Sequence, residues 1–249
     1  MRDKLKTALI TGASGGIGRA IALKFAKEGY FVVAQYNSNE QGIELLNAQL
    51  KEIGKSENCF ACQCDLSDNN SVLGFINQVK KSFKRVDVIV NNAGVGLYKL
   101  ITDTTEEEWD KLFSVNVKGT HLINNAFLKQ MIDYGKGKIV NVSSMWGLVG
   151  ASMEVAYSAS KSALIGYTKA LAKEVAPSGI NVNCVCPGVI DTPMNKRFSN
   201  EDMADLANQT PLLRIGKSEE VAELVWFLCS DKSDFITGQV ISCDGGFTL

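Results

Sequence analysis

The chain has 249 residues, of which 45% are hydrophobic, 21% charged and 8% aromatic, and 26 basic side chains nearly balance 27 acidic ones. This composition is ordinary for a globular protein and excludes a disordered, collagen-like or coiled-coil chain. A net charge of -1 provides no excess of basic groups for binding nucleic acid or anionic membranes, so we expect neither partner.

The sequence also indicates where the protein works. No apolar run approaches the ~20 residues of a membrane span, and the first residues lack the apolar core of a signal peptide. A chain of this size does not need disulfides, so seven cysteines are compatible with a cytoplasmic protein. Cys59, Cys62 and Cys64 lie close together, but there is no second Cys-x-x-Cys and only one histidine. We therefore expect these thiols to pack on a strand, and we expect no metal site.

Short apolar runs alternate with amphipathic runs along the chain. The apolar runs predict strands at residues 7–10, 31–34, 59–64, 86–90, 139–142, 180–185 and 240–243. Helical spacing predicts helices near residues 17–25, 43–53, 72–83, 105–131, 156–175 and 218–229. Regular alternation of this kind implies right-handed crossovers. It predicts one doubly wound α/β domain of Rossmann type over residues 1–249, with a seven-stranded, mainly parallel sheet and helices on both faces.

A glycine-rich loop follows the first predicted strand. Residues 11–18 read Thr-Gly-Ala-Ser-Gly-Gly-Ile-Gly, and a helix is predicted to begin within them. Glycines let the backbone turn sharply and approach a diphosphate, whose charge the N–H groups at the start of the helix then bind. In this position the loop predicts a dinucleotide site. Its expected contact residues are Gly12, Ser14, Gly15, Gly16, Ile17 and Gly18.

The pattern Thr-Gly-x-x-x-Gly-x-Gly resembles the signature of the short-chain dehydrogenase/reductase superfamily, in its compact single-domain branch. The sequence Asn-Asn-Ala-Gly at residues 91–94 and the Pro-Gly pair at residues 187–188 continue the resemblance. The further cofactor residues that we infer, chiefly from this resemblance, are Tyr36, Asn37, Ser38, Asp65, Leu66, Asn92, Ala93, Gly94, Tyr157, Lys161, Pro187, Gly188, Ile190 and Thr192. The catalytic set that it implies is Asn116, Ser144, Tyr157 and Lys161.

The residues after the second predicted strand indicate which dinucleotide is bound. NAD-specific sites place a carboxylate there, which accepts hydrogen bonds from the ribose hydroxyls and repels a 2′-phosphate. Here Tyr36, Asn37 and Ser38 occupy the region, and the first acid is Glu40. We expect NADP(H), with NAD(H) as the alternative. Since the loop lacks the arginine that NADP-dependent relatives often carry, Ser14, Asn37 and Ser38 are expected to hold the phosphate through neutral hydrogen bonds.

Tyr157 and Lys161 are four residues apart on a predicted helix, so their side chains share one face. A nearby ammonium stabilises a phenolate and lowers the pKa of the phenol from its usual value near 10. We expect Tyr157 to protonate the oxygen of a ketone as hydride reaches its carbon. Ser144 is expected to donate a hydrogen bond to that oxygen; its neighbour Ser143 competes for this role, but the family's spacing of 13 residues to the tyrosine selects Ser144. The resemblance implies that Asn116 holds a water linking Lys161 to solvent.

The substrate site is expected beyond the catalytic residues. Residues 188–214 are too long for a simple turn and predict short helices acting as a substrate lid. Substrate contacts are expected from Ser144, Trp146 and Tyr157. Further apolar wall is expected from Leu97, Tyr98, Leu148 and Val149. Such a pocket suits a ketone on an aliphatic chain.

Overall similarity is to the 3-oxoacyl-[acyl-carrier-protein] reductases of this superfamily, which act in fatty acid synthesis. Those enzymes usually present basic residues that attract the acidic carrier protein, whereas this chain has Gly135 and Ser178 at the corresponding positions. The alternatives are reduction of a ketone on a modified lysine of elongation factor P, a subgroup that residues 144–152 resemble, and a steroid, sugar or alcohol dehydrogenase. A non-catalytic dinucleotide-sensing regulator is the alternative of another class, although such proteins commonly lack the tyrosine or the lysine. The resemblance also implies a homotetramer.

Overall fold

The structure, a computed structural model, describes residues 5–195 and 198–249. These residues form the strands β1 (Thr7–Ile10), β2 (Phe31–Tyr36), β3 (Cys59–Gln63), β4 (Val88–Asn91), β5 (Gly137–Val142), β6 (Ile180–Pro187) and β7 (Val240–Cys243). They make one sheet in the order β3-β2-β1-β4-β5-β6-β7, and every neighbouring pair is parallel. The predicted doubly wound fold is confirmed, and the sheet is entirely rather than mainly parallel.

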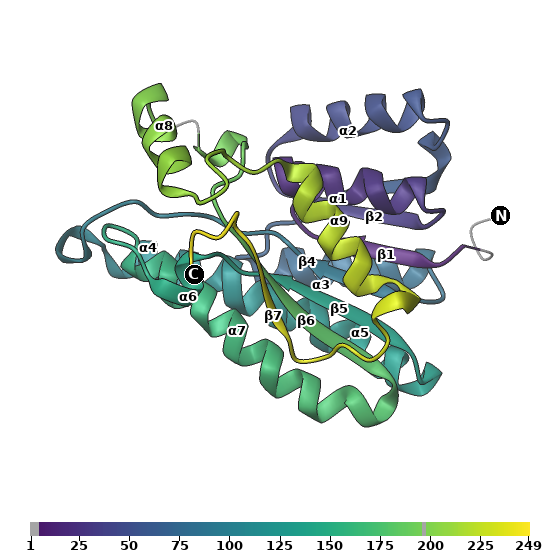
Figure 1. Cartoon of the computed structure of the whole chain (residues 1–249). Coiled ribbons are helices and arrows are strands. Elements are labelled where there is room, and N and C mark those ends of the chain that lie inside the picture. Colours follow the sequence, from purple (N-terminus) through teal and green to yellow (C-terminus); the bar gives the residue numbers. More distant parts are fainter. Residues whose placement is uncertain (1–4, 196–197) are drawn as a thin grey trace.

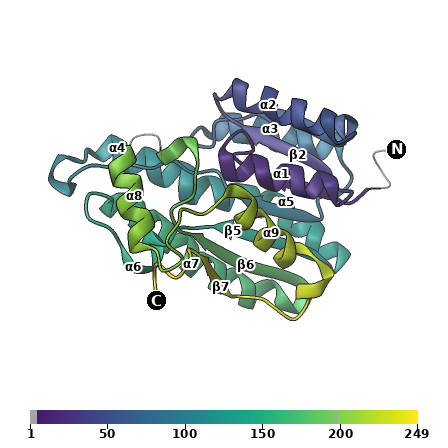
Figure 2. The same cartoon turned by 45° about the horizontal axis from the view of Figure 1, so that its top comes forward.

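Helices cover both faces of this sheet (Figures 1 and 2). They are α1 (Gly16–Lys27), α2 (Glu40–Glu52), α3 (Asn69–Ser82), α4 (Glu106–Phe113), α5 (Thr120–Tyr134), α6 (Trp146–Val149), α7 (Val155–Val175), α8 (Asn200–Gln209) and α9 (Ser218–Cys229). Helices α1, α2 and α9 share one buried cluster with the sheet, and α3, α5 and α7 share the other. Within residues 5–195 and 198–249, no helix is long and apolar enough to cross a bilayer.

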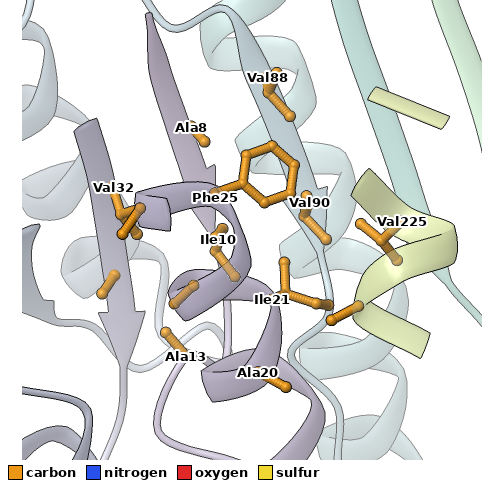
Figure 3. Packing of buried hydrophobic residues seen from close by; sticks show 14 of the residues in the cluster. Ala8, Ile10, Ala13, Ala20, Ile21, Phe25, Val32, Val88, Val90 and Val225 are labelled. Carbon is orange, nitrogen blue, oxygen red and sulfur yellow. The ribbon is translucent and has the colours of Figure 1, made fainter. Parts of the chain in front are cut away.

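Alternate residues of each central strand feed the two clusters, as the period of a strand requires. In β1, Ala8 and Ile10 belong to the cluster under α1, whereas Leu9 belongs to the opposite cluster. Figure 3 shows Phe25 and Ile21 of α1 lying over the strands on the first face. Because both faces of the sheet are covered, the central strands are rich in apolar residues rather than alternating with polar ones, which made them visible in the sequence.

The predicted helix over residues 105–131 is in fact interrupted. Its start is as expected, because Thr105 and Glu108 form a reciprocal capping box. The helix α4 then passes into a π-helical segment (Ser114–Gly119), from which α5 continues. The extra residue in this segment turns Asn116 into the interior, where it is fully buried.

The segment that follows β6 contains short helices, as predicted for a lid over residues 188–214. They are a 3₁₀ turn (Pro193–Asn195) and α8. The order of the strands reverses between β1 and β4: the chain builds the sheet outward in one direction from β1 to β3 and in the other from β4 to β7. Ligands of such folds bind near that point, at the carboxyl ends of the strands. Figures 1 and 2 show α8, α6 and the C-terminus gathered at one end of the sheet.

Candidate active site

A cleft of about 1410 Å³ lies among the loops at the carboxyl ends of the strands. The predicted cofactor residues that line it are Gly12, Ser14, Gly15, Gly16, Ile17, Gly18, Asn37, Ser38, Asp65, Leu66, Asn92, Ala93, Gly94, Tyr157, Lys161, Pro187, Gly188, Ile190 and Thr192. Ser144 and Trp146 line it too. Tyr36 and Asn116 do not line the cleft; Asn116 lies behind it and contacts the lining residue Val95.

The glycine loop between β1 and α1 has no room for a side chain at Gly12 or Gly18. Gly12 has a φ of +65°, and a Cβ on Gly18 would lie 2.1 Å from the carbonyl oxygen of Gly12. Helix α1 begins after Gly15 without a side-chain cap and without an acidic residue in its first turn. Its first N–H groups can therefore bind an anion. This uncapped, glycine-rich cradle fits the diphosphate of a dinucleotide.

Gln35, near the end of β2, braces this loop. It is 2% exposed. Its Oε1 accepts a hydrogen bond from the Gly12 N–H at 2.9 Å, and its Nε2 donates to the Cys64 carbonyl oxygen at 2.7 Å. Gln35 also lines the cleft and was not predicted. Its signal in the sequence is a glutamine within an otherwise apolar strand, since a buried amide needs such partners.

The far end of the cleft lies beyond β2 and β3. Asn37 and Ser38 are exposed there, and Ser14 is brought to the same cleft. Hydrogen bonds from the Ser67 side chain and backbone lower the pKa of Asp65, so this carboxylate is charged at neutral pH. Tyr36 is half-buried and packs against the hydrophobic cluster instead of lining the cleft. The residues directly after β2 are therefore neutral hydrogen-bonding groups, and the charged carboxylate of Asp65 lies beside Asn37.

Lys161 and Tyr157 project from the same face of α7 into the cleft. The ammonium of Lys161 lies 5.7 Å from the centre of the Tyr157 ring and donates to the Val142 carbonyl oxygen at 2.9 Å. Lys161 is 3% exposed. Burial lowers the pKa of Lys161 to about 8, against a smaller opposite effect of Cys184 and Cys186. The pair thus places an ammonium next to a phenol at the wall of the cleft.

The two serines after β5 have different roles. Ser143 donates its hydroxyl to the Lys161 carbonyl oxygen at 2.8 Å, which ties it to the backbone of α7. Ser144 is 8% exposed and lines the cleft, and its Oγ accepts a weak hydrogen bond from the Trp146 N–H at 3.2 Å. The Ser144 hydroxyl keeps its own proton for donation. This geometry favours Ser144 for contact with a substrate oxygen.

Asn116 stands behind the cleft. Its Oδ1 accepts from the Val95 N–H at 2.8 Å, and its Nδ2 donates to the Val95 carbonyl at 3.0 Å and to Ser160 Oγ at 3.0 Å. The side chain is therefore committed to the loop after β4 and to α7. The water that the resemblance places beside Asn116 stays a prediction.

Aromatic side chains form the remaining wall. Trp146 meets Phe247 edge-to-face at 5.5 Å between ring centres, and Tyr98 meets Phe198 in the same manner at 6.1 Å. All four line the cleft. Phe247 was missed by the sequence analysis because it comes from the far end of the chain. The expected wall residues Leu97, Leu148 and Val149 are not among those that line the cleft, and the last two are exposed.

The cysteines are all free thiols. Cys62 and Cys64 are buried and Cys59 is half-buried. Cys59 begins β3, Cys62 lies within it and Cys64 follows its end. In the described part of the chain, no group of three His, Cys, Asp or Glu side chains could hold a metal ion. The cleft chemistry described above uses none of these thiols directly.

The chain is similar to known proteins over nearly its whole length. A family model described as Enoyl-(Acyl carrier protein) reductase matches residues 12–248. The 3-oxoacyl-[acyl-carrier-protein] reductase FabG of Staphylococcus aureus is 40% identical over 244 residues, which cover 98% of each chain. The FabG of Thermotoga maritima is 40% identical over 250 residues and 100% of each chain. YmfI of Bacillus subtilis, an uncharacterized oxidoreductase, is 38% identical over 97% of this chain and 98% of its own.

Proposed function

Because the chain belongs to the short-chain dehydrogenase/reductase family, an oxidoreductase family, we propose that it reduces the ketone of a 3-oxoacyl thioester with NADPH. The observation that carries this proposal is the pair on α7: a buried ammonium 5.7 Å from a phenol ring at the wall of a cleft that begins at a glycine loop. The names of the FabG relatives support the thioester. The aromatic wall around Trp146 supports an acyl chain next to it.

Each group of residues along the cleft would have a separate role in the reduction. When bound, reduced nicotinamide supplies a hydride. The glycine loop and the start of α1 would hold its diphosphate. The hydroxyl of Tyr157 would donate its proton to the ketone oxygen, and the Lys161 ammonium would stabilise the phenolate left behind. The Ser144 hydroxyl would donate a hydrogen bond to the same oxygen while charge develops on it.

NADPH is the proposed cofactor because no carboxylate directly follows β2, the position from which NAD-specific sites repel a 2′-phosphate. The carboxylate of Asp65, which lies near Asn37, comes after β3 instead. Ser14, Asn37 and Ser38 supply neutral groups at that end of the cleft, and the first acid after β2 is Glu40 in the first turn of α2. A neutral site binds the phosphate less tightly than one with arginine. We therefore expect a clear but moderate preference for NADPH over NADH.

The proposed protein is a cytoplasmic homotetramer of single-domain chains. Its free thiols suit a reducing compartment. Phe235 and Leu249 are fully exposed in the single chain. Large apolar side chains exposed in this way are typical of a surface that another protein chain covers. The substrate is proposed to be a small molecule or a carrier-bound thioester.

The test is NADPH oxidation with acetoacetyl thioesters, carrier-bound and free, beside steroid and sugar ketones. We expect Tyr157→Phe to reduce kcat roughly 100- to 10,000-fold, with the Kd for NADPH unchanged. Tyr167→Phe is the matched control, because Tyr167 lies on the same helix and its hydroxyl contacts Asn124 outside the cleft. Full activity of Tyr157→Phe would overturn the proposed proton donor. Binding of NADPH without reduction of any ketone would favour a dinucleotide-sensing regulator.

A further inference from the structure

The hydroxyl of Ser160 lies between two residues of the proposed catalytic set. Ser160 is on α7, immediately before Lys161, and is fully buried. Its Oγ accepts a hydrogen bond from Asn116 Nδ2 at 3.0 Å and donates one to the carbonyl oxygen of Tyr157 at 2.8 Å. Ser160 is not among the residues that line the cleft. Any effect on the reaction must therefore pass through its neighbours.

Asn116 carries this contact to the other side of the site. Its amide makes two hydrogen bonds with the backbone of Val95, at 2.8 and 3.0 Å. The preceding residue, Gly94, lies against the ammonium, since a Cβ built on it would be 3.1 Å from Lys161 Nζ and 3.3 Å from Asn116 Oδ1. A continuous chain of contacts thus leads from Ser160 through Asn116 and the loop after β4 back to Lys161.

We propose that Ser160 is a positioning residue, whose hydroxyl fixes the π-helical segment and the loop after β4 against α7. This inference rests on the proposed function. Without the hydroxyl, the buried Nδ2 of Asn116 would lose one of its acceptors, and a buried donor left unpaired is costly. Asn116 would then shift toward another acceptor, and Gly94 would shift with it. Reactions of this kind are sensitive to displacements of about 1 Å.

The direct test is Ser160→Ala. We expect kcat to fall roughly tenfold, while the KM for NADPH changes less than about twofold, because Ser160 itself does not line the cleft. The pH profile of kcat should move to higher pH, since a displaced ammonium stabilises the phenolate of Tyr157 less. Ser160→Cys keeps similar volume with a weak hydrogen-bonding group, and its kcat should lie between those of the wild type and Ser160→Ala.

Thr168 offers a matched control on the same helix. It is also fully buried, its Oγ1 donates to the Leu164 carbonyl oxygen at 2.8 Å, and it accepts from Asn141 Nδ2 at 2.8 Å. Thr168→Val therefore removes one donated and one accepted hydrogen bond, as Ser160→Ala does, but two turns farther along α7. We expect it to lower Tm about as much as Ser160→Ala does, with kcat and its pH profile unchanged.

A double-variant cycle separates positioning from general destabilisation. If Ser160 acts through Asn116, adding Ser160→Ala to Asn116→Ala should change kcat by less than about twofold. If Ser160→Ala lowers only Tm and keeps the kcat and pH profile of Thr168→Val, the inference is overturned while the proposed function stands. If the wild type reduces no ketone, both fail. Should Ser160→Ala not fold, the same comparison is made with Ser160→Cys, and an unchanged kcat and pH profile again overturns the inference.

Discussion

The ammonium group of Lys161 is buried, so little water reaches it. The Lys161 ammonium donates a hydrogen bond to the backbone carbonyl of Val142. The thiols of Cys184 and Cys186 lie close enough to raise its pKa slightly, against the larger effect of burial. Burial of a charge in such surroundings opposes folding. The cost is understandable in functional terms, because an ammonium that is poorly hydrated acts more strongly on the phenol of Tyr157 beside it.

This cost predicts how stability depends on pH. The pKa of Lys161 is about 8 in the folded chain, below the usual 10.5, so between these values the unfolded chain binds more protons and stability rises with pH. Below pH 8 both forms are protonated and the full penalty remains. Lys161→Met should therefore be more stable than the wild type by up to about 3 kcal/mol near pH 7. Urea unfolding of both proteins without cofactor should show the gap closing toward pH 10.5. A gap that is constant with pH would contradict the assigned penalty.

Ser38 is the residue at which cofactor choice is best tested. It is exposed in the cleft where the 2′-phosphate is proposed to lie. Ser38→Asp should lower kcat/KM for NADPH relative to NADH by roughly tenfold to a hundredfold, because like charges then face each other. Ser38→Asn introduces a neutral side chain of the same shape as aspartate and should change that ratio little. Equal ratios for the two variants would place the phosphate elsewhere.

At the scale of elements, the glycine loop and the π-helical segment show how far sequence patterns reach. The loop could be predicted because all its information is local: closely spaced glycines between a strand and a helix. The π-helical segment could not, because the apolar spacing of Leu112, Phe113 and Val117 continues across it as in an ordinary helix. The end of a strand can also differ from its predicted position for a similar reason. β6 runs on to Pro187 since pairing with β7 extends it, and pairing is not visible in one strand alone.

The crowding within the loop predicts a sharp effect of one methyl group. Gly18→Ala would force a Cβ to within 2.1 Å of the Gly12 carbonyl oxygen, so the loop must shift. We expect a loss of about 1–3 kcal/mol in stability and at least tenfold weaker NADPH binding, measured by unfolding and by fluorescence titration. Gly74→Ala is the matched control: it lies in α3 with nothing within 4 Å. That variant should gain about 0.5–1 kcal/mol. Comparable losses in both would contradict the steric argument.

At the scale of the whole molecule, the residues least visible in the sequence are those that long-range packing brings to the cleft. Gln35 is separated from Gly12 by 23 residues, and Phe247 meets Trp146 from the other end of the chain. Motif residues could be assigned because the family resemblance orders them. Leu148 and Val149 lie two and three residues after Trp146, yet the short helix α6 leaves both exposed. Sequence proximity was therefore a poor guide to the aromatic wall of the cleft, whereas it located the glycine loop that lines the cleft.

The assembly is testable at the same scale. Four chains of 27.0 kDa should give about 108 kDa by light scattering. Phe235→Asp should weaken the assembly, because it would bury a charge if this fully exposed ring is covered by another copy. A control change on an exposed helix surface, Lys51→Asp on α2, should leave the mass unaltered. A wild-type mass of 27.0 kDa would refute the tetramer.

The edge-to-face contact of Phe247 with Trp146 has a practical consequence for handling the protein. The ring sits two residues before Leu249, and Asp244 holds the intervening turn through hydrogen bonds to Gly246 and Thr248. A purification tag fused after Leu249 would start at the rim of the cleft and crowd it. β1 begins at Thr7, at the amino ends of the strands and on the side opposite the C-terminus (Figure 1). Fusions placed ahead of that strand leave the cleft undisturbed and are the ones to use for kinetics.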